Sequence, residues 1–386
     1  MPYRTGQESR FIEEALAKGH LSSDGSFTRL CKAWLEERTG VEAALLTHSA
    51  TAGLELAAIL ADVGPGDDVL MPSFTFVTTA TSFLLRGATP VFVDIREDTL
   101  NLDEEAVAAA IGPRTKAIVA VHYAGVGCDM DSLAATARDA GIPLIEDAAQ
   151  AIMSEVDGRP LGGIGALGAL SFHETKNVMC GEGGALLVKD PELVERAEIV
   201  RDKGTNRKQF LRGQVDKYTW LDLGSSFAMS ELSAAFLWAQ LRQAEDITAR
   251  RIAIWDRYHA AFEELEREGR VRRPIVPPGC TQNGHLYYLL APDLAARSTI
   301  LRRLNERDVN AVFHYVPLHS SQAGRRYGRA AGDLTRTTEL SERLLRLPLW
   351  AGMTDDVIDC VVAEVLAAVK SVVPEQALST STPNRS

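Results

Sequence analysis

The residues most able to do chemistry are a lysine, a serine and an aspartate in the middle of the chain. Lys176 follows the apolar stretch 169–172, Ser171 stands five residues before it, and Asp147 lies 29 residues upstream, after the apolar stretch 142–146. A lysine amine can form a Schiff base with pyridoxal phosphate (PLP), a hydroxyl can bind the phosphate, and a carboxylate can keep the ring nitrogen protonated. The sequence therefore predicts PLP as the cofactor, with Lys176 and Asp147 as the catalytic residues.

Three further features could complete such a site, although each has a plain structural alternative. The small residues of Ser49-Ala-Thr-Ala-Gly-Leu54 open a predicted helix, and helix N-termini favour bound phosphate. Phe76 could stack on the pyridine ring, and Gln150 could hydrogen-bond the ring hydroxyl. The alternatives are N-caps at Ser49 and at Asp147, and core packing of Phe76.

A glycine-rich stretch, Gly163-Ile-Gly-Ala-Leu-Gly168, matches the dinucleotide-binding pattern G-x-G-x-x-G. That pattern must follow a strand and open a helix, but these glycines precede the predicted strand 169–172. We therefore interpret the stretch as a turn rather than as a site for NAD.

Two other residue groups invite a functional interpretation that the sequence does not favour. His314 and His319 could suggest a metal site, but no third ligand accompanies them, which favours a substrate-contacting or structural role. Cys180 lies near Lys176, but we interpret it as a small packed residue. The sequence therefore predicts no metal site and no cysteine nucleophile.

The composition is that of a globular enzyme and excludes several other classes. The 386 residues suffice for one large and one smaller domain, and 46% are hydrophobic and 24% charged. The net charge of −11 argues against a nucleic-acid partner. Five widely spaced cysteines, an N-terminus unlike a signal peptide and the lack of any run of 18 apolar residues predict a cytoplasmic protein without a membrane span.

The elements that must position these residues alternate between strand and helix. Near-continuous apolar strands between amphipathic helices, from about residue 40 to 250, predict an α/β fold with a mostly parallel sheet covered on both faces. The predicted strands are 68–71, 90–94, 116–122 and 142–146, and the predicted helices are 51–61, 75–85, 103–111 and one that ends at 140.

The C-terminal part predicts a second, smaller α+β unit. Its expected elements are a long helix at 225–265, strands at 285–290 and 309–313, a helix at 298–306 and two C-terminal helices. We accordingly divide the chain into a PLP-binding domain (1–250), a small C-terminal domain (251–372) and a polar tail (373–386) that we expect to be disordered.

Several long motifs resemble one known family. They are Ser171-Phe-His-Glu-Thr-Lys-Asn177, Lys203-Gly-Thr-Asn-Arg207, Arg212-Gly-Gln-Val-Asp-Lys-Tyr-Thr-Trp220, Gly224-Ser-Ser226 and Phe313-His-Tyr-Val-Pro-Leu-His319. Together they resemble the DegT/DnrJ type of PLP-dependent sugar aminotransferases, from about residue 20 to 370. Within that family, the chain most resembles the subgroup that makes dTDP-4-amino-4,6-dideoxygalactose.

The resemblance implies a fold-type I aminotransferase that forms a homodimer with active sites at the subunit interface. It implies that PLP is bound by Thr51, Ala52, Phe76, Asp147, Gln150, Ser171 and Lys176. Many members send an asparagine to the phosphate of the partner subunit, and Ser226 takes that place here. The residues expected to contact the substrate are Lys203, Arg212, Lys217, Tyr218, His314 and Tyr315.

The chain is therefore predicted to be a nucleotide-sugar 4-aminotransferase. Its small-molecule substrates would be L-glutamate and dTDP-4-keto-6-deoxy-D-glucose, with the amine transferred to C4 in the gluco or the galacto configuration. Lys176 stands where sugar 3-dehydratases of this fold carry histidine, which favours transamination. Two alternatives remain: a PLP-fold regulator without catalysis, and an NAD-dependent sugar oxidoreductase.

Overall fold

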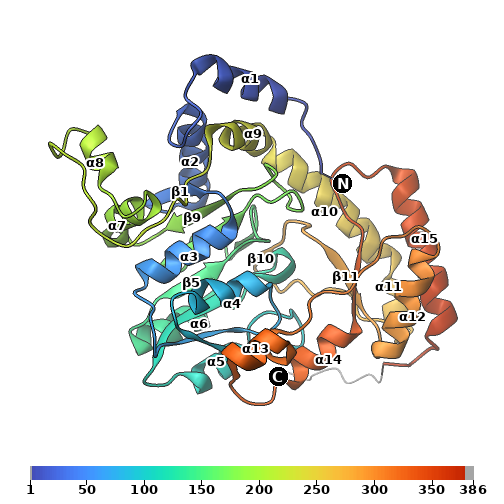
Figure 1. The fold of residues 1–386 in the computed structure, drawn as a ribbon. Helices are drawn as coiled ribbons and strands as arrows, with labels where there is room; N and C mark the ends of the chain where they lie inside the picture. Colours follow the sequence, from blue (N-terminus) through green and yellow to red (C-terminus); the bar gives the residue numbers. More distant parts are fainter. Residues whose placement is uncertain (1, 379–386) are drawn as a thin grey trace.

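The computed structural model describes residues 2–378, which are built around a large mixed sheet (Figure 1). Strand β9 is antiparallel to both of its neighbours, β1 and β8, and every other pair in the sheet is parallel. Across the sheet the order is β1 (Ala43–Thr47), β9 (Gly184–Val188), β8 (Leu167–Ser171), β5 (Leu144–Asp147), β4 (Thr115–Val121), β2 (Asp68–Pro72), β3 (Thr89–Val93) and β12 (Arg329–Ala330).

Helices cover both faces of this sheet, because its strands are apolar on both sides. In β1, Ala44 and Leu46 point into one core while Ala43 and Leu45 point into the other. The first face packs against α1 (Glu8–Lys18), α2 (Ser26–Thr39), α5 (Glu104–Ala110), α6 (Met130–Ala140) and α9 (Glu231–Leu241), and the second against α3 (Ala50–Leu60), α4 (Val77–Leu84) and α7 (Pro191–Arg201). The predicted α/β fold class is confirmed.

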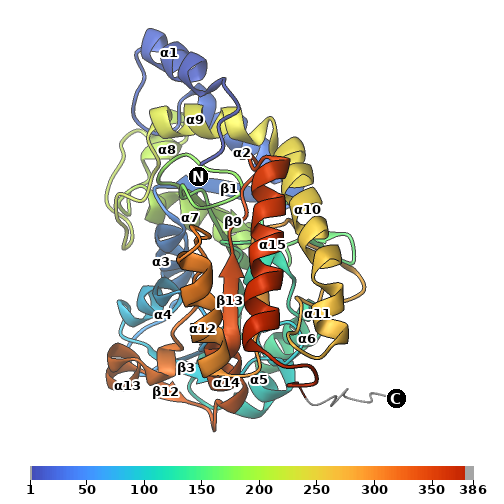
Figure 2. The same ribbon diagram turned by 90° about the vertical axis from the view of Figure 1, so that its right-hand side faces the viewer.

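The C-terminal part has its own apolar core around an antiparallel strand pair, β11 (Tyr287–Leu290) and β13 (Leu344–Leu347). Figure 2 shows β13 between α12 (Leu294–Asn305) and α15 (Asp355–Val372). The remaining elements are α8 (Arg207–Leu211), α10 (Ala244–Ala261), α11 (Glu263–Arg267), α13 (Gln322–Tyr327), α14 (Thr335–Arg343), the short strands β6 (Glu155–Val156), β7 (Arg159–Pro160) and β10 (Cys280–Thr281), and two 3₁₀ turns at Tyr123–Gly125 and Leu318–Ser320.

Two predicted elements of this part are wrong. The expected helix 225–265 consists of α9, α10 and α11 and begins only at Glu231, with Ser230 as its N-cap. Residues before it are extended because they pair with the end of β1, where Thr47 bridges Ala228. The expected strand 309–313 is irregular, and only Val312 in it bridges Arg346.

The proposed boundary at residue 250 falls inside α10, a helix that joins both cores. Ala244 packs in the core under the large sheet, and Ile254 packs in the C-terminal core. In the predicted tail, Gln376 and Leu378 donate backbone hydrogen bonds to Glu268 and Gly269, and positions 379–386 lie outside the described residues. In the described part of the chain, no helix is both long and apolar enough to cross a membrane.

Candidate active site

One cavity of about 1000 Å³ gathers most of the predicted cofactor residues. Its walls come from the carboxyl ends of β5 and β8, from the starts of α3 and α4, from residues 310–315, and from β13 with the segment that follows it. Parallel α/β sheets present ligand-binding groups at this edge. The predicted residues that line the cavity are Thr51, Phe76, Asp147, Gln150, Ser171, Lys176, His314 and Tyr315.

The start of α3 forms a corner with free amide donors. Ser49 Oγ accepts a hydrogen bond of 3.1 Å from the Ala52 amide, so the expected phosphate contact of Ala52 through its amide would compete with an N-cap. Within residues 2–378, the amides of Ala50 and Thr51 have no partner, and both residues line the cavity. Ser171 Oγ accepts from the His173 amide at 3.4 Å and keeps its own hydrogen for a ligand. This corner suits a phosphate group.

Gly184 is what allows this corner to form. It begins β9 directly beside the start of α3, and a Cβ atom there would lie 2.4 Å from the Ala50 nitrogen. Residue 184, the last of the Gly181-Glu-Gly-Gly184 stretch, is therefore a glycine for a steric reason. Any side chain there would prevent the start of the helix from approaching the sheet so closely.

Asp147 is the last residue of β5 and is buried. Its Oδ2 accepts a hydrogen bond of 2.7 Å from Thr79 Oγ1, and its Oδ1 accepts one of 3.2 Å from the Ala149 amide. Thr79 is in turn bonded to Thr75 at 2.7 Å. A turn, not a helix, follows Asp147, so the alternative that it caps a helix is wrong.

Lys176 lies on the turn after β8, where its amide donates to the His173 carbonyl. In the described part of the chain, its amine makes no hydrogen bond and no ion pair. Burial lowers the pKa of this amine to about 8, Asp147 opposes the shift, and Arg346 adds to it. Lys176 is thus an amine of raised nucleophilic character facing a cavity that also holds a buried carboxylate.

Aromatic side chains form another wall of the cavity. Gln150 accepts from the Ala124 amide at 2.8 Å and donates to the Tyr315 hydroxyl at 2.9 Å, which fixes its orientation. The Phe76 ring is 54% exposed although it lines the cavity, and its centroid lies 6.4 Å from that of Tyr315. An exposed ring beside a phosphate corner and a carboxylate fits a flat aromatic ligand.

The two histidines of the Phe313–His319 motif have different partners. His314 Nδ1 is bonded to the Tyr123 hydroxyl at 3.1 Å and lines the cavity. His319 Nδ1 is bonded to Ser73 Oγ at 2.7 Å and does not line it. His314 therefore stays a candidate substrate contact, and His319 has a structural role.

Besides Ala52, five predicted residues do not line this cavity within one chain. They belong to an arm, residues 202–230, that carries α8 away from the body (Figure 1). Lys203 binds Asp202 at 3.1 Å, and Arg212 binds Glu198 with two hydrogen bonds of 2.8 and 2.9 Å. The five residues are Lys203, Arg212, Lys217, Tyr218 and Ser226.

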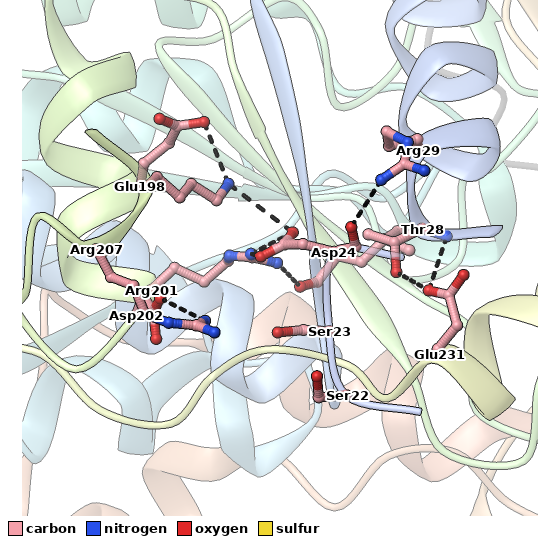
Figure 3. Close-up of polar contacts among 12 residues, drawn as sticks. Ser22, Ser23, Asp24, Thr28, Arg29, Glu198, Arg201, Asp202, Arg207 and Glu231 are labelled. Atoms are coloured by element: carbon pink, nitrogen blue, oxygen red, sulfur yellow. Dashed lines mark hydrogen bonds and ion pairs between the residues drawn. The ribbon is translucent and has the colours of Figure 1, made fainter. Parts of the chain in front are cut away.

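A buried ion-pair network fixes the base of this arm (Figure 3). Arg201 in α7 is fully buried and donates to both Asp24 oxygens at 2.6 Å. Lys208 in α8 reaches Glu198 at 3.1 Å and Asp24 at 3.9 Å. Burial, reinforced by Arg201, lowers the pKa of Lys208 to about 8. The segment around Asp24 and the two helices therefore form one charged joint.

The glycine-rich stretch binds an internal carboxylate. Glu146, fully buried, accepts hydrogen bonds of 2.7, 2.7 and 2.6 Å from the amides of Gly162, Ile164 and Gly165. Its Oε2 also lies 2.9 Å from His122 Nε2. The amides that would hold a dinucleotide phosphate are occupied by this side chain, so the interpretation as a turn is confirmed.

Several cavity residues were missed by the sequence reasoning. Thr75, which lines the cavity, precedes Phe76, and Thr79, which holds Asp147, follows it; their hydroxyls at one-turn spacing are a local signal that was overlooked. Arg251, His285 and Arg346 come from positions far along the chain, and only the fold brings them to Lys176. Burial lowers the pKa of Arg251 to about 9, and its guanidinium donates to the carbonyls of Gly284 and His285.

Comparison with known proteins finds similar chains and similar structures. The chain is 33% identical over 381 residues to the spore coat polysaccharide biosynthesis protein SpsC of Bacillus subtilis, covering 97% of this chain and 96% of that protein. Its structure is similar to the aminotransferase TlmJ of Streptoalloteichus hindustanus, with a TM-score of 0.89, 34% identity, and 96% and 98% of the two chains covered.

A second similar structure is that of a protein in its PLP form. It is the PLP form of Spr1654 from Streptococcus pneumoniae, a candidate sugar aminotransferase, with a TM-score of 0.88, 26% identity, and 96% and 98% of the two chains covered. Residues 2–366 match the model of one aminotransferase family. PLP is accordingly the cofactor of this enzyme, and the chain belongs to the DegT/DnrJ/EryC1/StrS aminotransferase family.

Proposed function

We propose that this enzyme transfers an amino group from L-glutamate to C4 of dTDP-4-keto-6-deoxy-D-glucose. The observation that carries the reaction type is the shared cavity of Lys176 and Asp147, with the phosphate corner of α3 and Ser171 beside them. A sugar acceptor is supported by the relatives, since SpsC serves polysaccharide biosynthesis and Spr1654 is a candidate sugar aminotransferase. The dTDP sugar itself rests on the resemblance to enzymes that make dTDP-4-amino-4,6-dideoxygalactose.

The residues around Lys176 and Asp147 have distinct roles in this proposal. When bound, PLP supplies a protonated pyridine ring that withdraws electrons from the substrate carbon. Asp147 holds the proton on the ring nitrogen, while Thr79 and the Ala149 amide hold Asp147. Lys176 moves a proton between the donor carbon and C4′ of the cofactor, because its lowered pKa lets the amine act as a base near neutral pH. Ser171 and the start of α3 bind the phosphate.

We also propose that two copies of the chain share their active sites. The arm exposes large apolar side chains that its own chain leaves uncovered, such as Trp220, 76% exposed, and Leu211, 66% exposed. Such a cluster on a projecting segment is typical of a subunit interface. In this arrangement Ser226 binds the phosphate in the neighbouring subunit, and Lys203, Arg212, Lys217 and Tyr218 contact its substrate. The free cysteines fit the predicted cytoplasmic location.

One incubation tests the reaction and its stereochemistry. The purified enzyme, PLP and L-glutamate are mixed with dTDP-4-keto-6-deoxy-D-glucose, and the product is examined by NMR. We expect a 4-amino sugar and 2-oxoglutarate in equal amounts; large couplings of H4 to H3 and H5 would identify the gluco amine, and small ones the galacto amine. The control is the Lys176→Ala variant. No amino sugar with this substrate, from an enzyme that still consumes L-glutamate's amino group with another keto sugar, would contradict the proposed acceptor.

A further inference from the structure

Arg346 is a cation of the cavity whose role is not explained by the cofactor contacts. It lies on β13, and its backbone exchanges two hydrogen bonds with Val312, of 2.7 and 3.1 Å. Its pairing with Tyr288 of β11 fixes the strand from the other side. The side chain therefore enters the cavity from a rigid support, which is how binding groups are held in register.

The Arg346 guanidinium has no partner in residues 2–378: it makes neither a hydrogen bond nor an ion pair there. Arg251, which lines the same cavity, differs, because its guanidinium is bonded to two backbone carbonyls. Nearby Arg272 also differs, since it faces Glu97 at 3.8 Å. A guanidinium has five donors, so an unpaired one in a ligand cavity is available to an oxyanion.

The charge of Arg346 acts directly on the reacting end of the cavity. Together with burial, it lowers the pKa of Lys176 to about 8 and of His314 to about 2. Asp147 is the one buried carboxylate that lines the cavity in the described residues, and it is already held by Thr79 and the Ala149 amide. Arg346 thus adds a positive charge near Lys176 that no protein group neutralises.

We propose that Arg346 binds the carboxylate of the amino donor, an inference that rests on the proposed transfer from an α-amino acid. The planar guanidinium matches a carboxylate through two parallel hydrogen bonds. The phosphate corner is built from α3 and β8, so Arg346, on β13, is free for a second anion.

The position of Arg346 favours the donor over the other anion that enters this site, the diphosphate of the nucleotide sugar. An α-carboxylate is bonded directly to the carbon whose proton Lys176 removes, so its cation must lie within electrostatic reach of Lys176. The diphosphate is separated from C4 by the width of the sugar ring. Arg346 meets the first requirement, because it lines the same cavity as Lys176, and its charge contributes to the lowered pKa of that amine.

Binding measurements on the PLP-loaded enzyme test this role without relying on turnover. Glutarate serves as an unreactive carboxylate probe and dTDP as an unreactive diphosphate probe, and calorimetry gives Kd for each. We expect Arg346→Gln to weaken glutarate binding by about 10- to 100-fold, the loss typical of a charge-assisted contact, and to leave dTDP binding unchanged. Arg346→Lys keeps the charge but not the two parallel hydrogen bonds, so it should lose less glutarate affinity than Arg346→Gln. Arg302→Gln, an exposed arginine of α12, is the matched control and should change neither.

Unchanged glutarate affinity in Arg346→Gln would overturn the inference, and so would a wild type that binds no glutarate. A loss of dTDP affinity with unchanged glutarate affinity would assign Arg346 to the nucleotide and overturn it as well. The proposed sugar substrate can fail separately. An enzyme that aminates no dTDP-keto sugar, yet loses glutarate affinity in Arg346→Gln, would refute that substrate and still support the role of Arg346.

Discussion

Thr79 donates its hydroxyl hydrogen to the Asp147 carboxylate across 2.7 Å, and both side chains are buried. The bond joins the first turn of α4 to the end of β5, so two elements far apart in sequence hold one carboxylate in place. An ionised, oriented carboxylate is what a protonated ring nitrogen needs as its partner.

Replacement of Asp147 by asparagine should lower turnover by roughly 100-fold or more, because the amide keeps the size of the side chain but not the charge that holds the ring proton. Steady-state kinetics measures the loss of turnover, and thermal unfolding of the same sample establishes that the variant is folded. Thr79→Val should cause a smaller loss, which Thr79→Ser should largely restore. Full activity in Asp147→Asn would leave Asp147 with a structural role only.

Lys176→Ala should abolish turnover, with a loss of about 1000-fold or more, because neither the other cavity residues nor solvent can move the proton between the same two atoms. The check is product formation over long incubation, combined with circular dichroism to establish that the variant is folded. Near wild-type turnover would refute the assignment of Lys176.

The lowered pKa of Lys176 also predicts how the cofactor-free protein responds to pH. Between pH about 8 and 10.5 the unfolded lysine is protonated and the folded one is neutral, so the unfolded state binds more protons and stability rises with pH. Below about pH 8 the buried charge is destabilising. The full shift corresponds to about 3 kcal/mol, and we expect roughly 1–2 kcal/mol because the side chain is partly exposed.

Urea unfolding of cofactor-free wild type and Lys176→Met measures this effect. The methionine variant should be more stable than wild type at pH 7.5, and the difference should shrink by pH 9.5. A difference that is independent of pH would show that Lys176 is not shifted.

Ser226 and Ser230 form a matched pair for the proposed shared site. Ser230 caps α9 by accepting from the Ser233 amide, whereas Ser226 lies in the extended segment and caps no helix. Ser230→Ala should cost about 0.5–2 kcal/mol of stability with unchanged PLP affinity. Ser226→Ala should weaken PLP retention without lowering the melting temperature of the cofactor-free protein. The opposite pattern would remove Ser226 from the site.

A mixed dimer tests whether Ser226 acts across the interface. One subunit carries Lys176→Ala, and the other carries a Ser226 substitution that prevents PLP binding in its own homodimer. If the sites are shared, the subunit with Lys176 receives an intact Ser226 from its neighbour, and one site in each heterodimer works. Heterodimers without recovered activity would refute the cross-subunit role.

Asp24→Asn tests the joint at the base of the arm. Asp24 has a φ of 68°, which asparagine tolerates, so the change removes charge without new backbone strain. The buried Arg201 then loses its anion, and we expect a loss of about 1–3 kcal/mol, together with a raised KM for the sugar at nearly unchanged kcat. The exposed Asp139 offers the control variant Asp139→Asn. A wild-type KM for the sugar in Asp24→Asn would show that the joint does not influence substrate binding.

Local pattern was enough for the central part of the site. Asp147, Ser171 and Lys176 stand at or just beyond the ends of apolar stretches, and side chains at the carboxyl ends of adjacent strands must meet at one edge of a sheet. The order of turns and strands around the glycine-rich stretch likewise excluded a dinucleotide site, because that decision needs only the position of the glycines in the chain.

Long-range contacts decided the rest. The apolar spacing predicts a helix that begins at residue 225, yet the pairing of Ala228 with Thr47 of β1 keeps the residues before α9 extended and moves the helix start to Glu231. The amide of Ala52 was expected to contact the phosphate, but in the structure it donates a hydrogen bond to Ser49 Oγ. Arg346 reaches the cavity only because β13 pairs with β11 more than 50 residues earlier in the chain. Periodicity predicts the secondary structure that one segment can form by itself. Whether the guanidinium of Arg346 beside Lys176 stays unpaired depends instead on which side chains the folded chain brings near it.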